Sequence, residues 1–350
     1  MATAATSQAG PGLDGLRGQL DKAGCTALLL TSPGGRRYAL GSAPGLCDGT
    51  VVLLTTDGTV ASAVGDLSAA ITAALRATGV ADGVVGVDAD LPGEVFGRAN
   101  DAGVRWRPAA DLVFAELACC EPEELPAFTA AAGLAAVGYT AVMDHLRVGM
   151  DVRELSGNVD RSIRRAGGLL GWYDQSGEIG GIGANGAAGS DLVTVRGHDP
   201  GTARLTATSP VRYVLHPLLE GVAGYAAATA VLSKADGPLR AAGDTGAAAT
   251  AALLAALRPG APLREGYAAF DREAGEHRAA CRIVALRGGG ASLPLAPDST
   301  VIAEPGMVLG VRTEVVAPGR GAIELAETVV VTASGADPQA RTPLRLVELY

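Results

Sequence analysis

The residues best suited to chemistry are charged side chains set among apolar neighbours in the C-terminal part of the chain. Arg312 and Glu314 lie two residues apart in one apolar stretch, and Glu324 lies in the next. Alternate residues of a strand share a face, so Arg312 and Glu314 are expected to point the same way. A buried charge has to be paired, which favours a salt-bridged cluster of these residues. Such a cluster either offers a guanidinium fork to a substrate carboxylate or only holds the sheet open.

His198 is the candidate for proton transfer. It lies in the segment Arg196-Gly-His-Asp-Pro200, and imidazole exchanges protons near neutral pH. The alternative is an ordinary loop histidine beside an aspartate. Tyr225, Tyr173 and Asp174 are candidates to line a cavity beside these charged residues, although aromatic residues belong more often to a core.

The first part of the chain alternates helix and strand patterns, which predicts an α/β layered domain. Its apolar spacing indicates a helix over 13–23, a strand over 27–30, a hairpin over 50–62, a helix over 67–77 and a strand over 83–88. Asp57-Gly58 supplies the turn of the hairpin, because both residue types accept the positive φ values that such a turn needs.

A second pattern begins at Cys120-Glu-Pro-Glu-Glu, where proline and acidic residues suit a helix N-terminus. It predicts a long Ala-rich helix to about residue 146, a turn, and a second helix that ends near Gly167-Gly168. The phrase from Leu146 to Leu155 recurs from Leu257 to Gly266, an offset of 257 − 146 = 111 residues. Two copies of a helix–turn–helix phrase indicate a domain of two related halves.

Composition excludes several classes of partner and site. The net charge is −9 with a pI of about 5.0, and without a basic stripe nucleic acid is excluded as a partner. Five cysteines without disulfide or zinc spacing favour a reducing, cytoplasmic setting. Residues 1–12 lack the features of a secretion signal and are expected to form a flexible leader. The Ala-rich stretches are too weakly apolar to predict a membrane span.

The order of these segments resembles the creatinase and aminopeptidase P family, peptidase family M24. The resemblance implies a creatinase-like α/β domain over 13–119 and a pseudo-symmetric "pita-bread" domain over 120–350, an α/β (α+β) fold overall, and a homodimer. The segments that carry it are Thr26-Ala-Leu-Leu-Leu-Thr-Ser-Pro, Glu121-Pro-Glu-Glu, the two Leu-Arg-x-Gly phrases, Glu304-Pro-Gly-Met-Val-Leu and Thr328-Val-Val-Val-Thr.

Metal-binding members of that family hold two metal ions with two Asp, one His and two Glu. In this chain the corresponding positions are Pro217, Ala228, a position near Gly289, Arg312 and Ala326. None of these residue types binds a metal, so no metal and no cofactor is expected. Glu314 and Glu324 share the parity of the ligand positions but lie about 6–7 Å along their strands from them. Arg287 has the same parity, so the resemblance implies that it joins the salt-bridged cluster of Arg312, Glu314 and Glu324. Glu327 and His216 are expected to face away from the site.

Three functions remain open. The first is a metal-independent enzyme acting on a small amino-acid-like or carboxylate metabolite, since the resemblance implies a catalytic His in the loop of His198, and Glu324 is a second catalytic candidate. Its candidate substrate-binding residues are Arg312, Arg287, Glu314, Tyr225, Tyr173 and Asp174. The second is a non-catalytic relative that binds a ligand or protein. The third is an Xaa-Pro-type metallopeptidase with displaced ligands. A GxGxxG match at Gly181–Gly186 lacks the strand and helix of a dinucleotide site.

Overall fold

The computed structural model describes residues 3–8, 13–40, 50–89, 93, 103–170, 193–195, 204–220, 222–287 and 293–350. The chain divides into two compact units. Unit 1 comprises Met1–Leu117 with Ala291–Leu293, and unit 2 comprises Ala118–Gly290 with Pro294–Tyr350. The break at residues 117 and 118 lies just before the Glu-Pro-Glu-Glu segment at which the sequence pattern changes.

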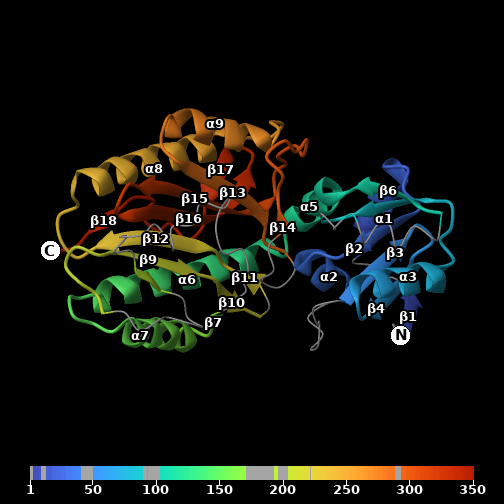
Figure 1. Cartoon of the computed structure of the whole chain (residues 1–350), viewed down its shortest axis with the longest axis horizontal. Helices are drawn as coiled ribbons and strands as arrows, with labels where there is room; N and C mark the ends of the chain where they lie inside the picture. The colour runs from blue at the N-terminus through green and yellow to red at the C-terminus, as the bar shows by residue number, and fades with distance from the viewer. Residues whose placement is uncertain are drawn as a thin grey trace. The chain divides into compact units, whose positions relative to one another are not determined.

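Unit 1 is built on a six-stranded sheet in the order β1-β4-β3-β2-β5-β6 (Figure 1). Its strands are β1 (Thr3–Gln8), β2 (Ala27–Leu30), β3 (Thr50–Thr55), β4 (Thr59–Val64), β5 (Val84–Val87) and β6 (Arg105–Pro108). Its helices are α1 (Asp14–Lys22), α2 (Pro33–Leu40), α3 (Leu67–Thr78) and α5 (Ala110–Ala118). Every element that the apolar spacing predicted is present, namely α1, β2, the hairpin of β3 and β4, α3 and β5. The spacing was informative because strands such as β2 and β3 are buried along their whole length.

Residues 1–12 were expected to form a flexible leader, and this expectation was wrong for residues 3–8. Thr3–Gln8 form β1, which pairs antiparallel with β4 from Thr3↔Val64 to Gln8↔Thr59. The residues of β1 are small or polar, so they lack the apolar pattern that marks a strand. The backbone of β4 satisfies their hydrogen bonds instead, which a search for apolar periodicity does not detect.

Unit 2 contains, within the described residues, a nine-stranded sheet that includes the path β14-β13-β15-β16-β12-β9-β8, with β17 beside β16 and β18 beside β12. A three-stranded sheet has the order β11-β10-β7. The strands of the large sheet are β8 (Val193–Val195), β9 (Pro210–Leu215), β12 (Ala226–Val231), β13 (Ala279–Ala285), β14 (Leu293–Pro294), β15 (Val308–Ala317), β16 (Gly321–Thr332), β17 (Gly335–Pro338) and β18 (Val347–Glu348). Those of the small sheet are β7 (Leu169–Leu170), β10 (Pro217–Leu219) and β11 (Val222–Ala223).

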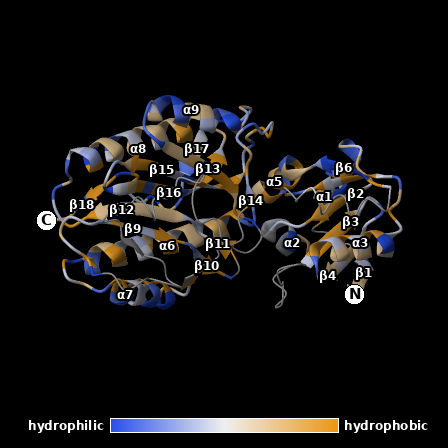
Figure 2. Cartoon of the chain, in the orientation of Figure 1, coloured by the Kyte–Doolittle hydropathy of each residue, from blue (hydrophilic) through white to orange (hydrophobic). Residues whose placement is uncertain are grey.

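Four helices accompany these sheets: α6 (Leu125–His145), α7 (Val152–Arg165), α8 (Gly237–Ala256) and α9 (Arg264–Ala274). Figure 1 shows α8 and α9 along one edge of unit 2 and α6 and α7 along the other, with strands between them. In Figure 2 the hydrophilic colours gather on α7 and α9, whereas the strands between the helices are mostly hydrophobic. Helix α6 is long and apolar enough by length and composition to cross a membrane, but its buried residues pack as those of a core helix do.

The two helix pairs are related by the predicted repeat. Gly149 between α6 and α7 has φ 82°, and Gly260 between α8 and α9 has φ 83°, at an offset of 260 − 149 = 111. Each glycine donates its N–H to the carbonyl of a residue that follows an isolated β-bridge: Leu205 after Arg204, and Ala303 after Ile302. Two turns with the same rare φ and the same kind of partner confirm that unit 2 consists of two related halves.

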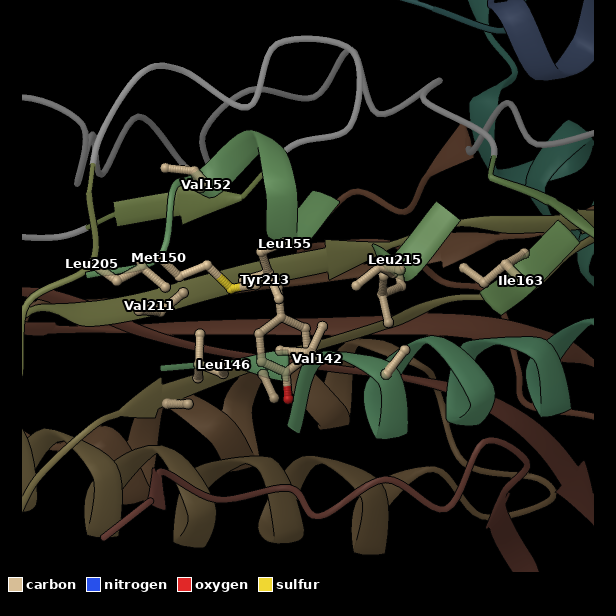
Figure 3. Packing of buried hydrophobic residues seen from close by; sticks show 14 residues of the cluster. Val142, Leu146, Met150, Val152, Leu155, Ile163, Leu205, Val211, Tyr213 and Leu215 are labelled. Carbon is tan, nitrogen blue, oxygen red and sulfur yellow. The ribbon is translucent and has the colours of Figure 1, made fainter. Parts of the chain in front are cut away.

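Helices α6 and α7 cover their half of the sheet through one apolar cluster (Figure 3). The ring of Tyr213 from β9 lies at its centre, between Val142 of α6 and Leu155 of α7. Tyr213 is 1% exposed, and burial holds the pKa of its hydroxyl well above the usual value. The cluster fixes the odd-numbered residues of β9 toward the helices.

The halves meet where β12 lies beside β16, and side chains carry much of this junction. Strands β12 and β16 share one backbone pair in the described residues, Ala227↔Ala326. On one side of it, Thr229 Oγ1 accepts from Glu324 N at 2.8 Å and donates to Glu324 O at 3.2 Å. On the other side, Thr328 Oγ1 accepts from Tyr225 N at 2.7 Å and donates to Tyr225 O at 3.1 Å. Two threonine hydroxyls, placed symmetrically about an alanine pair, thus join the halves.

Candidate functional site

The helices define which face of the large sheet is left for a site. On β15, Thr313 Oγ1 lies 2.7 Å from Oγ1 of Thr250 in α8, and a Cβ on Gly246 of α8 would contact Val315 at 3.6 Å. The odd-numbered residues of β15 therefore face the helices, and the even-numbered ones face the opposite side. We call the face that carries the even-numbered residues of β15 the inner face; Phe128 and Leu125, at the start of α6, also pack on it.

The same argument applies to the other half of the sheet. Leu215 of β9 and Ala228 of β12 belong to the cluster packed under α6 and α7, so Arg212, Val214 and Ala227 have the inner-face parity. Ala228 was the position assigned to a metal-binding Asp, and that assignment does not hold in this structure. The inner-face residue opposite Ala326 is its neighbour, Ala227.

Strand register arranges the inner face in rows that run across the strands. The charged row contains Glu314, Glu324, Thr229 and Arg212. The middle row contains Arg282, Arg312, Ala326, Ala227 and Val214. The aromatic row contains Val284, Gly310, Thr328, Tyr225 and His216. Neighbouring rows are two residues, about 6–7 Å, apart along each strand.

The charged residues form one compact cluster. Arg212 Nη1 lies 3.0 Å from Glu324 Oε2 and 3.4 Å from Glu314 Oε2, and Arg312 Nε lies 2.6 Å from Glu324 Oε1. None of the four side chains is more than 4% exposed. The structure thus brings Arg312, Glu314 and Glu324 together as the sequence suggested, although their roles in binding or catalysis stay predictions.

Arg212 is the member of this cluster that sequence reasoning missed. It interrupts the apolar strand Pro210–Leu215 in the same way that Arg312 interrupts β15. An arginine in an otherwise buried strand was the signal that could have found it, since such a charge must meet a carboxylate. Its guanidinium links carboxylates of the second half to a strand of the first.

Arg287 was expected in this cluster, and the structure places it elsewhere. Arg282 is the β13 residue opposite Arg312, and Arg287 lies five residues further on, which gives it the opposite parity. Its Nη2 pairs with Glu124 Oε1 at 2.8 Å, and its Nη1 donates to the carbonyl of Cys119 at 3.1 Å. Arg287 therefore ties the start of α6 to the end of β13.

His216 also differs from expectation. It was expected to face away from the site, but it continues the alternation of Arg212 and Val214, and its ring lies 4.5 Å from that of Tyr225. Tyr225 is 3% exposed and packs with Ala227 and Ala326 in one inner-face cluster. The error arose because parity was counted from Pro217, which belongs to β10 of the small sheet.

Glu327 faces away from the inner face, as expected from parity. Its Oε1 accepts the backbone N–H of Thr328 at 2.9 Å and of Ala340 at 2.8 Å. Burial raises the pKa of Glu327 to about 7, although the backbone N–H donors around it act in the opposite direction. The carboxyl fastens the segment after β17 to β16 and takes no part in the site.

Several sequence candidates lie outside the described residues: His198, Tyr173, Asp174 and Gly289. The structure therefore gives no position for the histidine assigned to proton transfer. Of the substrate-binding candidates, Tyr225 lies on the inner face beside Ala227.

The described inner-face residues do not fit a pair of metal ions. Among the described residues, no three His, Cys, Asp or Glu side chains are close enough together to hold one. The two carboxylates present, Glu314 and Glu324, are instead paired with guanidinium groups. The positions beside them carry Ala326 and Ala227, which have no donor atom.

Comparison with known proteins agrees with this architecture. The chain resembles dipeptidase PepE from Mycobacterium ulcerans at 18% identity and a TM-score of 0.68, over 97% of each chain. It resembles an Xaa-Pro dipeptidase from Bacillus anthracis at 18% identity and a TM-score of 0.64, over 97% of this chain and 99% of that one. The N-terminal domain of the FACT complex subunit SPT16 from chickpea matches at 13% identity and a TM-score of 0.61, over 97% and 98%. These likenesses define the fold class, two related α/β halves around a shared sheet in the pita-bread arrangement.

The family follows from the sequence match. The model of metallopeptidase family M24 matches residues 127–333, more than half of the chain. The chain therefore belongs to metallopeptidase family M24. No match was found among curated proteins.

Proposed function

We propose that the chain is an M24 enzyme that acts, without a pair of metal ions, on a small amino-acid-like or carboxylate metabolite bound at its inner face. The observation that supports this is the buried cluster of Arg212, Arg312, Glu314 and Glu324. Burying an ion costs several kcal/mol before pairing, and apolar residues of similar size often give equal or greater stability. Charges kept at that cost in the middle of a sheet face favour a functional role.

The cluster offers a definite way to bind a carboxylate. Arginine presents a planar fork that matches a carboxylate in two parallel hydrogen bonds. Within the cluster the contact between Arg212 and Glu314, at 3.4 Å, is the longest. A ligand carboxylate is expected to compete with Glu314 there, whereas Glu324 keeps its shorter contacts. His198 and Glu324 are the acid–base candidates in this proposal, and Tyr225, Tyr173 and Asp174 the lining.

A thermal-shift screen tests the binding part of the proposal. The protein is dialysed against a chelator and then heated with single amino acids, dipeptides or small carboxylic acids. A ligand that binds only the folded state stabilises it by about 2.7 kcal/mol at 100 times its dissociation constant, so at least one carboxylate should raise the melting temperature. Arg212→Lys keeps the charge but loses the fork, and should reduce this shift. Arg164→Lys on the exposed side of α7 is the matched control.

The result that would count against the proposal is equally clear. If no carboxylate raises the melting temperature, or if Arg212→Lys and Arg164→Lys respond alike to every ligand, the inner face is not a carboxylate site. Retained binding without any turnover would leave a binding protein in place of an enzyme.

A metallopeptidase is the second candidate, because several structural relatives are named prolidase or Xaa-Pro dipeptidase. The measurement is metal analysis of the purified protein together with hydrolysis of Xaa-Pro dipeptides in the presence of Mn²⁺. Stoichiometric metal, and turnover that a chelator abolishes, would replace the metal-independent proposal. We expect turnover or binding to survive the chelator.

A further inference from the structure

A cavity of about 460 Å³ lies between α8 and the segment 345–350. Helix α8 contributes Arg240, Gly243, Asp244 and Ala247, which share one face of the helix because they are spaced by three or four residues. The volume falls within the range of small-molecule sites, about 300–1,000 Å³. Since α8 packs on the opposite side of β15 from the inner face, this cavity is separate from the charged cluster described above.

Packing fixes the segment 345–350 against the rest of unit 2. Strand β18 pairs in parallel with β12, beside which it lies in Figure 1. Leu346 packs directly on Gly243 of α8, where an added Cβ would lie 2.8 Å from Leu346 Cβ. A larger residue than glycine would push the segment away from the helix. The shape of the cavity is therefore set by the same contacts that hold the segment in place.

One part of the cavity wall is a complete hydrogen-bonded network around Glu348. Its Oε1 accepts from the backbone N–H of Ala235 at 2.8 Å and from Nη2 of Arg240 at 3.1 Å, and its Oε2 accepts from the hydroxyl of Tyr350 at 2.7 Å. Arg240 Nη2 also donates to the carbonyl of Ala235 at 2.9 Å. The charges of Arg240 and Glu348 thus neutralise each other, and this part of the wall needs no ligand.

The other two charges in the wall, Asp244 and Arg345, are not neutralised in this way. Neither has an ion-pair partner among the residues that the structure describes, although both line the same cavity. Asp244 stands four residues after Arg240, the spacing at which a helix pairs opposite charges, but Arg240 is engaged by Glu348. Both side chains are exposed, so a ligand can reach them from solvent. The cavity therefore offers one negative and one positive group to a ligand.

A ligand that satisfies both groups carries a cation and an anion of its own. A carboxylate matches the planar guanidinium of Arg345 in two parallel hydrogen bonds, and an ammonium group donates to the carboxylate of Asp244. A free α-amino acid carries both groups on one carbon. Leu346 and Ala247 supply apolar surface in the same wall, and burial against such surface favours an aliphatic side chain.

We propose that the cavity between α8 and the segment 345–350 binds a free aliphatic α-amino acid, with its carboxylate at Arg345 and its ammonium group at Asp244. The site does not depend on the proposed function, because none of its residues lies on the inner face. Helix α8 packs on β15 of the second half, and β18 pairs with β12 of the first. An amino acid held by both residues therefore links the two halves of unit 2.

The test is calorimetric titration of the full chain with L-leucine and with two analogues that each lack one charge. L-Leucinamide lacks the carboxylate, and 4-methylpentanoate lacks the ammonium group. Each analogue should bind about 10–100-fold more weakly than L-leucine, since each loses the hydrogen bonds to one charged group.

Four variants connect each charge of the ligand with one residue. Arg345→Gln should weaken L-leucine about 10–100-fold but leave L-leucinamide unchanged, because that analogue has no carboxylate. Asp244→Asn should likewise weaken L-leucine and leave 4-methylpentanoate unchanged. Ala247→Phe should fill the cavity and abolish binding of all three compounds, with an unchanged far-UV circular dichroism spectrum. Arg272→Gln, at an exposed position of α9, is the matched control and should leave all three affinities unchanged.

The outcomes separate this site from the inner face. Absence of L-leucine binding, or equal affinity for L-leucine and either analogue, would overturn the proposal. It would also be overturned if Arg345→Gln and Asp244→Asn bind L-leucine as well as Arg272→Gln does. If Arg212→Lys weakens L-leucine and Arg345→Gln does not, the amino acid binds at the inner face, which supports the proposed function and removes the second site.

Discussion

Replacing Arg312 by methionine should destabilise the protein by several kcal/mol, because it leaves a buried carboxylate short of a counter-charge. Removing one partner of a buried ion pair costs about 3–5 kcal/mol. Glu324 would lose its 2.6 Å contact but keep Arg212 at 3.0 Å, so Arg312→Met should fall near the lower end, about 3 kcal/mol. Arg212→Met removes a contact from both carboxylates and should fall near the upper end, about 5 kcal/mol.

Urea unfolding followed by far-UV circular dichroism measures these differences. The control is Arg164→Met, since Arg164 and its partner Asp160 are 58% and 32% exposed, and a helical pair of this kind is worth about 0.2–0.5 kcal/mol. The double variant Arg312→Met/Glu324→Gln should recover part of the loss, because it removes the uncompensated charge as well; coupling energies in such cycles are about 0.5–3 kcal/mol. An Arg312→Met variant as stable as Arg164→Met, or an additive double variant, would refute the argument from paired burial.

Three further predictions concern single positions. Burial raises the pKa of Glu327 from 4.5 to about 7, so the free energy of unfolding should fall by roughly 3 kcal/mol as the pH rises from 4.5 to 7. Urea unfolding of Glu327→Gln at several pH values should show a weaker pH dependence than the wild type, and an equal dependence would contradict the raised pKa. Gly157→Ala, in an exposed position of α7 with open space for a Cβ, should raise the free energy of unfolding by about 0.5–1 kcal/mol. Gly260→Ala, at φ 83°, should lower it by about 1 kcal/mol or more; thermal unfolding measures both changes, and the reverse order would refute the interpretation of the turn. Gly310→Ala would place a Cβ 2.7 Å from Val284 Cγ2 and 3.1 Å from Tyr225 Cδ1, so it should cost about 1–3 kcal/mol of stability and shift the Tyr225 ring signals in NMR. A variant with unchanged stability and unchanged signals would contradict the close packing of Tyr225 on Gly310.

Most of the fold could be predicted from the sequence, because its main signals are local. Buried strands such as β2 and β3 are continuous apolar runs, and in the turn between β3 and β4 Gly58 adopts the predicted positive φ, 88°, whereas Asp57 does not. The repeat at an offset of 111 predicted the two halves of unit 2, since the glycine of each turn adopts the same positive φ. Strand β1 was missed because its residues follow no apolar pattern.

The site could be predicted only in part, because its composition depends on strand register. The prediction that His216 faces away from the site was wrong because strand parity was counted from Pro217. The metal-ligand position was assigned to Ala228, but the residue opposite Ala326 is Ala227. A shift of one residue moves a side chain to the other face of a sheet, so errors of this size exchange members of the site. Arg212 and Glu324 are more than a hundred residues apart in the sequence, and only the pairing of β9, β12 and β16 brings them within 3.0 Å.

The threonine hydroxyls at the junction of β12 and β16 have a mechanical consequence for unit 2. A regular ladder resists separation of its strands through one backbone bond after another, but here Thr229 and Thr328 act on either side of the single Ala227↔Ala326 pair. A hydroxyl can rotate about its C–O bond and follow a moving partner, which a peptide group in a ladder cannot do. The junction between the halves is therefore held largely by side-chain hydrogen bonds, in contrast to the ten-pair backbone ladder of β15 and β16. The ion pairs of Arg212 span the same junction, so a rotation of one half against the other would change their distances.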